Sequence, residues 1–330
     1  MKKVDLLLGI FVTGIWGANF SVIKLGLGAL DPFLLTSLRF TLCFLPLIFF
    51  VKKPDVRLSI IALYGLLFGV GLWGIVNLGI YLGLSAGIAS LILQFSAFFT
   101  IIFATFIFGE RISKSQIAGM GVAFAGLISI LAVTDGSVST IGVALVIFGA
   151  VCWSSCNIIV RKNKPANMLA FIVWSSLFSA MPLFLITFFV EGPQPFHGLL
   201  QALNGMAVFS IMFQSYITTI FGYWIWNSLM KKYPASSVAP LSLFVPVSGL
   251  ITSWLVFDER IAFGKIIAAI LILSGMAILF MQNQSSNILA TALRDEAHRE
   301  VALPDLTPWN CSSLPTLCTA SGSTRTPRLR

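Results

Sequence analysis

Long apolar runs of about 18–24 residues recur along this chain of 330 residues, and they constrain its fold more than any other feature. Each run can cross a hydrocarbon core of roughly 30 Å as a helix. Hydrophobic residues make up 57% of the chain, above the roughly 45–50% of average soluble domains. Backbone groups in lipid must satisfy their own hydrogen bonds, so helices are favoured over open strands. The sequence therefore predicts an all-α membrane protein.

Ten transmembrane helices are expected before a polar tail. Their approximate ranges are 5–24, 32–51, 58–79, 85–108, 114–133, 139–160, 168–190, 205–229, 235–257 and 262–281. The first run follows Lys2 and Lys3, as a signal peptide would. It continues for about 19 residues without a small-residue cleavage site, so we expect a retained helix.

Basic residues are concentrated in alternate predicted loops. If the N-terminus is cytoplasmic, 12 Lys and Arg residues before the tail fall in inner segments and 3 fall in outer segments. This positive-inside pattern predicts that both termini are cytoplasmic. The net charge of +9 is then explained by helix orientation, and we expect no nucleic-acid partner.

One short motif occurs twice, 149 residues apart. The letters FGERI at 108–112 return as FDERI at 257–261. We therefore expect two five-helix halves, residues 1–134 and 138–282, because internal repeats are typical of transporters. Five is odd, so the second half should be an inverted copy of the first. Residues 283–330 are polar and rich in Ser, Thr, Pro and Arg, and we expect a disordered cytoplasmic tail.

The repeated motif has the residue types of a helix boundary. Gly109 can take the left-handed conformation that ends a helix, and Ser113 and Gln116 have capping-box spacing for the next helix. A carboxylate near that helix start is favourable. We interpret the acid–base pairs as structural turns at the interface or as gating elements, a set that comprises Glu110, Arg111, Glu259 and Arg260.

Amides and aromatic residues recur together inside the predicted spans. A polar group deep in lipid is costly unless it faces protein or a water-filled cavity. Such pairs can bind a small zwitterion, although they can equally join helices or form interfacial belts. We predict a substrate cavity lined by Trp16, Asn19, Arg39, Asn77, Gln94, Phe98, Trp153, Asn157, Tyr223 and Asn227.

Arg39 is the full charge that lies well inside a span. It can meet a substrate carboxylate, or it can reach the interface as an anchor or pair structurally. Pro240 and Pro246 interrupt the ninth span, either as a packing kink or as a bending point for gating. The Asp and Glu residues all lie at span ends, in loops or in the tail. We therefore expect facilitated transport or exchange rather than a carboxylate-based proton antiport.

Several other chemistries are disfavoured. Cys152 and Cys156 share a helix face, but no His lies near them in the sequence, so we expect no metal site. We also expect no cofactor, and no enzyme, because no nucleophile or acidic cluster accompanies the two histidines. The phosphate-binding pattern GxxxxGK is missing, so direct use of ATP is not indicated.

The order of motifs resembles a known family. They are WGANFSVIK, LRF followed by Pro46, AGIASLILQFSAFFTI, FGERI, FGYWIW, VAPLSLFVPVSGL and FDERI. Together they resemble the EamA branch of the drug/metabolite transporter superfamily, over residues 1 to about 282. The resemblance implies ten helices in two inverted repeats around a central cavity, alternating access, and a bacterial inner membrane.

The same resemblance implies export of small amino-acid-like metabolites, and it is greatest to members that export cysteine and O-acetylserine. The fold hosts many cargoes, so efflux of other amino acids, purine-type metabolites or drugs stays open as an alternative. Besides the substrate, the expected partner is the lipid bilayer. The sequence leaves open whether the chain acts as a homodimer.

Overall fold

The computed structural model describes residues 1–132, 136–233, 235–259 and 263–279, which lie in one compact unit, Met1–Asn287. These residues form helices and loops, and no strand occurs among them. Nine of their helices are long and apolar enough to cross a membrane, and the apolar helix Phe263–Leu279 is shorter. The predicted all-α class is therefore confirmed for the described residues. The expected tail, residues 283–330, and Arg260 of the repeated motif lie outside the described residues.

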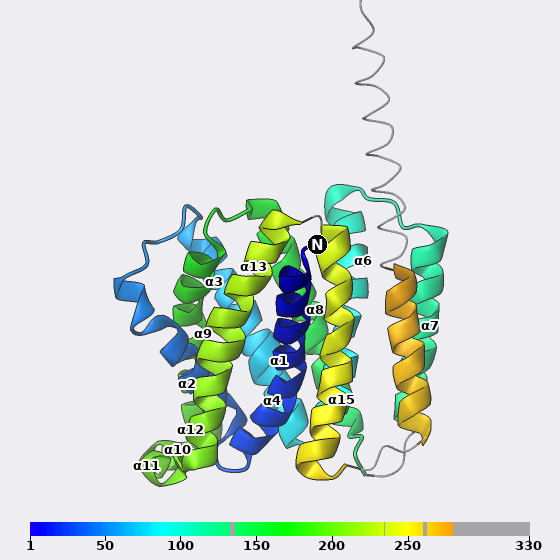
Figure 1. Ribbon diagram of the computed structural model, residues 1–330. Helices are drawn as coiled ribbons and strands as arrows, with labels where there is room; N and C mark the ends of the chain where they lie inside the picture. Colours follow the sequence, from blue (N-terminus) through cyan, green and yellow to red (C-terminus); the bar gives the residue numbers. More distant parts are fainter. Residues whose placement is uncertain (133–135, 234, 260–262, 280–330) are drawn as a thin grey trace, which may run out of the picture. The chain divides into compact units, whose positions relative to one another are not determined.

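The helices follow the predicted ranges to within a few residues (Figure 1). They are α1 (Lys3–Leu27), α2 (Pro32–Phe44) with η1 (Leu47–Phe49), α3 (Leu58–Gly65), η2 (Leu66–Gly74), α4 (Ile75–Tyr81), α5 (Ala86–Ile92), η3 (Leu93–Phe95), α6 (Ser96–Phe108), α7 (Lys114–Leu131), α8 (Thr140–Asn163), α9 (Met168–Glu191), α12 (Gly205–Met212), η4 (Phe213–Phe221), α13 (Gly222–Lys232), α14 (Ala235–Val238), η5 (Ala239–Leu243) and α15 (Phe244–Phe257). The short α10 (Gln194–His197) and α11 (Leu199–Ala202) lie between α9 and α12.

Irregular turns interrupt the third and eighth spans at matching places. In each, an α-helix of 8 residues is followed by 9 residues of π-helix, which are η2 and η4. The fourth and ninth spans each contain a 3₁₀ segment, η3 or η5. π-Turns are rare and often occur at functional sites, because the wider turn redirects side chains.

The two prolines of the ninth span have different effects. Pro240 lies in η5, so the predicted interruption occurs there. Pro246 is the third residue of α15 and does not break this helix, contrary to the prediction. The first four N–H groups of an α-helix have no partner within it, so a proline there removes no helical hydrogen bond.

The turn after α6 has the predicted structure. Gly109 follows the helix with φ of 70°, in the left-handed region. Ser113 and Gln116 form the predicted capping box at the start of α7. In the second copy of the motif, Asp258 occupies the left-handed position after α15, with φ of 49°.

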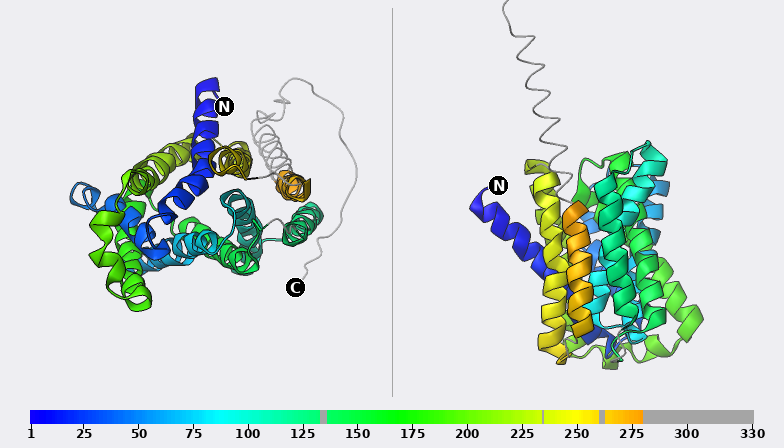
Figure 2. Two further views of the ribbon diagram at one scale, coloured as in Figure 1. Left: turned by 90° about the horizontal axis from the view of Figure 1, so that it is seen from below. Right: turned by 90° about the vertical axis from the view of Figure 1, so that its right-hand side faces the viewer.

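The first helix, α1, packs closely against α15, which is more than 200 residues later in the sequence (Figure 1). A Cβ atom at Gly17 would lie 2.2 Å from the carbonyl oxygen of Val245 and 2.7 Å from the backbone nitrogen of Gly249. The Ser248 hydroxyl donates to the carbonyl of Gly14 at 2.7 Å. Small residues and such hydrogen bonds hold helices together in lipid, where apolar burial gives little drive. Figure 2 shows the helix Phe263–Leu279, coloured orange, beside α7.

We expect Gly17→Ala to destabilise the fold, because its methyl group would collide with the backbone of α15. Overpacking of this kind costs roughly 1–3 kcal/mol. Gly14→Ala is the matched control on the same helix, since a Cβ there meets nothing within 4 Å. Thermal unfolding in detergent should give a lower Tm for Gly17→Ala and an unchanged or higher Tm for Gly14→Ala. Equal Tm values for the two variants would contradict the packing described above.

Candidate functional site

A cavity of about 510 Å³ lies between helices drawn from both sequence halves. This volume is within the usual range for small-molecule sites, about 300–1,000 Å³. Eight of the ten predicted residues line it, namely Trp16, Asn19, Arg39, Gln94, Trp153, Asn157, Tyr223 and Asn227. They come from α1, α2, η3, α8 and α13.

The other two predicted residues do not line this cavity. Phe98 is buried in α6 and its ring packs against Phe95, with centroids 5.7 Å apart. Asn77 in α4 donates from Nδ2 to the hydroxyl oxygen of Thr36 in α2, at 2.8 Å. Asn77 thus joins two helices, the alternative that the sequence had left open for such amides.

Aromatic rings form much of the cavity wall. The ring centroid of Trp16 lies 5.2 Å from that of Tyr223 and 5.3 Å from that of Trp226. The Trp16 indole N–H donates to the carbonyl of Thr218 in η4 at 3.0 Å, which fixes the orientation of the ring. A Cβ atom at Gly222 would lie 2.6 Å from that indole nitrogen, so the glycine of FGYWIW provides room for Trp16.

Arg39 is fully buried, with 1% of its surface exposed. Its Nη2 donates to Thr219 Oγ1 at 2.9 Å and its Nη1 to Gln214 Oε1 at 3.4 Å. The guanidinium also lies 4.3 Å from the ring centroid of Trp73. The ion pairs found among the described residues do not include Arg39. The side chain therefore does not extend to the interface as an anchor, because hydroxyl, amide and aromatic groups hold it inside.

Three buried polar atoms on lining residues have no hydrogen-bond partner among the described residues. They are Oδ1 of Asn19, Nε1 of Trp73 and Nδ2 of Asn227. Buried polar groups are nearly always paired, and an unpaired one costs roughly 1–3 kcal/mol. One acceptor and two donors are thus available to a bound molecule or to water.

The cavity reaches one end of the helix bundle. We define the near end by Lys3, Met168 and Lys232, and the far end by Lys24, Ser85 and Glu259. At the near end, Asp5 accepts hydrogen bonds from Lys232 at 2.7 Å and Tyr233 at 2.5 Å.

The cavity lining includes Met168, Met230 and Val160, all within a few residues of the near end. The lining residues nearest the far end along α1 are Asn19 and Phe20, and Phe20 is four positions, or roughly 6 Å of helix, before Lys24. Lys24, Ser85 and Glu259 themselves do not line the cavity, which therefore extends toward the near end and stops short of the far end.

None of the described residues of the repeated acid–base motifs lines the cavity. Glu110 forms an ion pair with Arg161, while Arg111 is exposed. Glu259 forms an ion pair with Lys24, whose Nζ is 2.6 Å from Oε1. Each motif glutamate thus forms an ion pair with a cation from another helix, as a structural role would require. The sequence did not indicate these partners.

Both glutamates lie outside the spans and have lowered pKa values. The hydrogen bond from Arg161 lowers the pKa of Glu110 below its ordinary value of 4.5. Burial alone would raise the pKa of Glu259, but hydrogen bonds from Lys24, Ser253 and Ser85 outweigh it and lower the pKa. Each pair therefore stabilises the fold fully above about pH 4.5, and this stabilisation is lost as the pH falls through the lower folded-state pKa.

The predicted set of cavity residues does not include Gln214, Thr219, Trp73 or Trp226. Gln214 and Thr219 are five residues apart and both contact Arg39, because η4 is a π-helix. An analysis that assumes 3.6 residues per turn places them on different faces. A usable signal was the cluster of polar residues from Gln214 to Thr219 inside an apolar span.

Comparison with known proteins gives consistent matches. The model of the EamA-like transporter family matches residues 4–132 and 140–281. A "Probable amino-acid metabolite efflux pump" of Escherichia coli (strain K12) is 36% identical over 285 residues, covering 84% of this chain and 95% of the relative. A protein of the same description from Salmonella typhimurium is also 36% identical over 285 residues, with the same coverage.

More distant matches agree in fold. An "Uncharacterized transporter" of Bacillus subtilis is 25% identical over 285 residues, covering 83% of this chain and 96% of the relative. A crystal structure of a protein with 18% identity aligns with a TM-score of 0.58 and covers 86% of this chain and 97% of its own. At that identity the match shows the fold alone.

We expect Arg39→Met to leave stability nearly unchanged or to raise it, because replacing a buried charge by an apolar side chain is often neutral or favourable. Asn77→Ala should lower stability by roughly 1–3 kcal/mol, since it removes a buried bond between helices. Thermal unfolding in detergent checks both. A loss above about 3 kcal/mol for Arg39→Met would show that the cation is needed for the fold.

Proposed function

Because the chain belongs to the EamA-like transporter family, we propose that it is a secondary transporter that exports small amino-acid-like metabolites through the cavity beside Arg39. It is a membrane transporter, with nine apolar helices of spanning length among its described residues. The two relatives at 36% identity carry the description of a probable amino-acid metabolite efflux pump. That description supports the substrate class, and the cavity adds chemical detail.

The observation that carries the proposal is the buried guanidinium of Arg39, whose known partners are neutral. A substrate carboxylate would supply the missing negative charge and a bidentate partner. Trp73 lies against the guanidinium, and its free N–H offers a further donor at the same place. A buried anion is costly unless a cation and hydrogen-bond donors compensate it. Arg39 and the Trp73 N–H supply these partners, so the site favours a substrate that carries a carboxylate.

The other lining groups suit the rest of an amino acid. Asn19 Oδ1 is an unpaired acceptor for an ammonium group, and the faces of Trp16 and Tyr223 can contribute cation–π attraction. The described lining residues include no Asp or Glu. This arrangement fits neutral α-amino acids such as cysteine and O-acetylserine, and it disfavours cationic drugs, which lack a carboxylate.

A second candidate is the export of aromatic amino acids or purine-type metabolites. It rests on the cluster of Trp16, Trp153, Tyr223 and Trp226 along the cavity wall. Flat rings can stack on these side chains. The volume of about 510 Å³ leaves room for such a cargo.

The proposed topology has ten helices in two inverted repeats, residues 1–134 and 138–282, with both termini cytoplasmic. The two family-model matches and the equivalent π-helices η2 and η4 support the repeat. The distribution of basic residues supports the orientation. The near end is then cytoplasmic, and substrate enters the cavity from the cytoplasm. Alternating access follows if the far end opens in turn.

We expect inside-out vesicles that contain the protein to take up radiolabelled cysteine and O-acetylserine more than threonine or tryptophan. Arg39→Gln should reduce this uptake roughly ten- to hundredfold, because it removes one hydrogen bond to a charged group. Cysteamine, which lacks only the carboxylate of cysteine, should be a poor substrate for the unmodified protein.

Two results would contradict the proposal. One is equal uptake of cysteine and cysteamine, and the other is full uptake by Arg39→Gln. Preferential uptake of tryptophan would favour the second candidate. Arg39→Lys is the matched control, since it keeps the charge but loses the planar fork, and it should retain part of the activity.

A further inference from the structure

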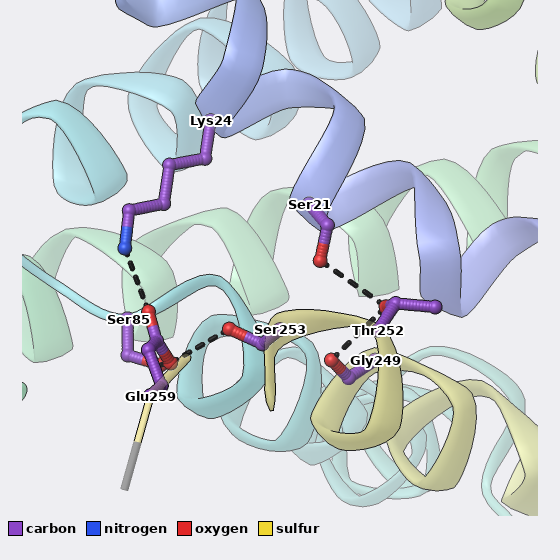
Figure 3. Close-up of polar contacts among 7 residues, drawn as sticks. All are labelled: Ser21, Lys24, Ser85, Gly249, Thr252, Ser253 and Glu259. Atoms are coloured by element: carbon purple, nitrogen blue, oxygen red, sulfur yellow. Dashed lines mark hydrogen bonds and ion pairs between the residues drawn. The ribbon is translucent and has the colours of Figure 1, made fainter. Parts of the chain in front are cut away.

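Glu259 is held at the far end by groups from three helical segments (Figure 3). Its carboxylate accepts hydrogen bonds from Lys24 Nζ at 2.6 Å, from Ser253 Oγ at 2.6 Å and from Ser85 Oγ. Lys24 also lies over the ring of Phe257, 4.3 Å from its centroid. The end of α1, the start of α5 and the end of α15 thus meet at one carboxylate.

Glu110 has an equivalent arrangement in the other sequence half. It pairs with Arg161 near the end of α8, and the guanidinium of Arg161 lies 4.4 Å from the ring centroid of Phe108. In both copies the glutamate stands two residues after the phenylalanine over which its cation lies. In both, the cation belongs to the first helix of the other sequence half.

The two ion pairs differ in exposure. The side chains of Lys24 and Glu259 are 34% and 16% exposed, whereas those of Arg161 and Glu110 are 48% and 47% exposed. The more buried pair lies at the far end, which the cavity does not reach. The more exposed pair lies at the end of α8, close to the cavity-lining residue Val160. The more buried ion pair is thus at the end that the cavity does not reach, and the more exposed pair is at the end toward which the cavity extends.

Further hydrogen bonds continue along α1 and α15 beside this site. Ser21 Oγ donates to Thr252 Oγ1 at 3.1 Å, one helical turn before Lys24 (Figure 3). Thr252 in turn donates to the carbonyl of Gly249 at 3.2 Å. A path from the cavity between α1 and α15 at this end would separate the two helices and break the contact between Lys24 and Glu259.

We propose that Lys24, Glu259, Ser85 and Ser253 form a latch that keeps the far end of the cavity closed, and that Glu110 and Arg161 form its counterpart at the near end. The latch is a set of positioning residues, which act on access and do not touch the substrate. The inference rests on alternating access in the proposed function. It extends that function by naming the contacts whose rupture opens each end.

The test measures access to the cavity from the far-end side. A single reporter cysteine replaces Ala97, which lines the cavity, in a full-length chain whose five native cysteines are replaced by alanine. A membrane-impermeant thiol reagent is applied to right-side-out and inside-out vesicles without substrate. When the latch residues are unchanged, we expect the reagent to label the reporter cysteine fast from the near-end side and slowly from the far-end side.

Glu259→Gln should speed labelling from the far-end side by at least about tenfold, because it removes the negative charge that strengthens the hydrogen bonds from Lys24, Ser85 and Ser253. The charge exchange Lys24→Glu with Glu259→Lys should restore slow labelling, which a merely structural role would not predict. Glu110→Gln is the matched control in the other copy, and it should leave far-end labelling slow. If Glu259→Gln does not fold, Ser85→Ala is the milder variant, with a smaller acceleration expected.

Unchanged far-end labelling in folded Glu259→Gln or Ser85→Ala protein would overturn the latch. Fast far-end labelling that the charge exchange fails to reverse would also overturn it. The assay contains no substrate, so it separates the two proposals. Accelerated labelling in a protein that transports none of the four amino-acid-type probes would support the latch and reject the cargo.

Discussion

Lipid offers no hydrogen bonds, and this constraint decides where every polar side chain of the spans can lie. Most serines and threonines donate back to a carbonyl of their own helix, as Ser175 does to Phe171 at 2.7 Å. Asn77 donates its amide N–H across from α4 to α2, although its Oδ1 has no partner among the described residues. Arg39 differs from these groups, because its partners are neutral and leave its charge uncompensated. The cavity thus forms where the helices do not fully satisfy their own polar groups.

The two π-helices explain how such a cation can be held in place. η2 contributes Trp73, whose ring lies against the guanidinium, and η4 contributes Thr219 and Gln214, which accept its hydrogen bonds. A regular α-helix would not bring residues five apart onto one face. The wide turn therefore allows a single segment to supply both acceptors. The segments η2 and η4, which correspond in the proposed repeat, meet at this one side chain, so the proposed repeat would bear directly on the chemistry of the site.

Hydropathy predicted the spans because each helix is long and every side chain in it experiences the same apolar solvent. Composition also predicted eight of the residues that line the cavity, since an amide inside a span is costly unless it faces protein or a water-filled cavity. Phe98 and Asn77 show the limit of that argument, because Phe98 packs against Phe95 and Asn77 bonds to Thr36, both outside the cavity. The ion pairs were beyond reach for a different reason. Lys24 and Glu259 lie 235 residues apart, and no local spacing connects them.

The unequal burial of the two ion pairs bears on how the cavity could change sides. A carboxylate with several hydrogen bonds, such as Glu259, is harder to release than one exposed to water, such as Glu110. The ion pair at the far end is therefore the more firmly held of the two in this structure. Substrate on Arg39 can alter that balance only if it binds the two states differently. Arg39 is on α2 and Lys24 is on α1, and each contacts a segment from the other half of the sequence. Under the proposed alternating access, a rearrangement of the interface between the halves would therefore move both residues.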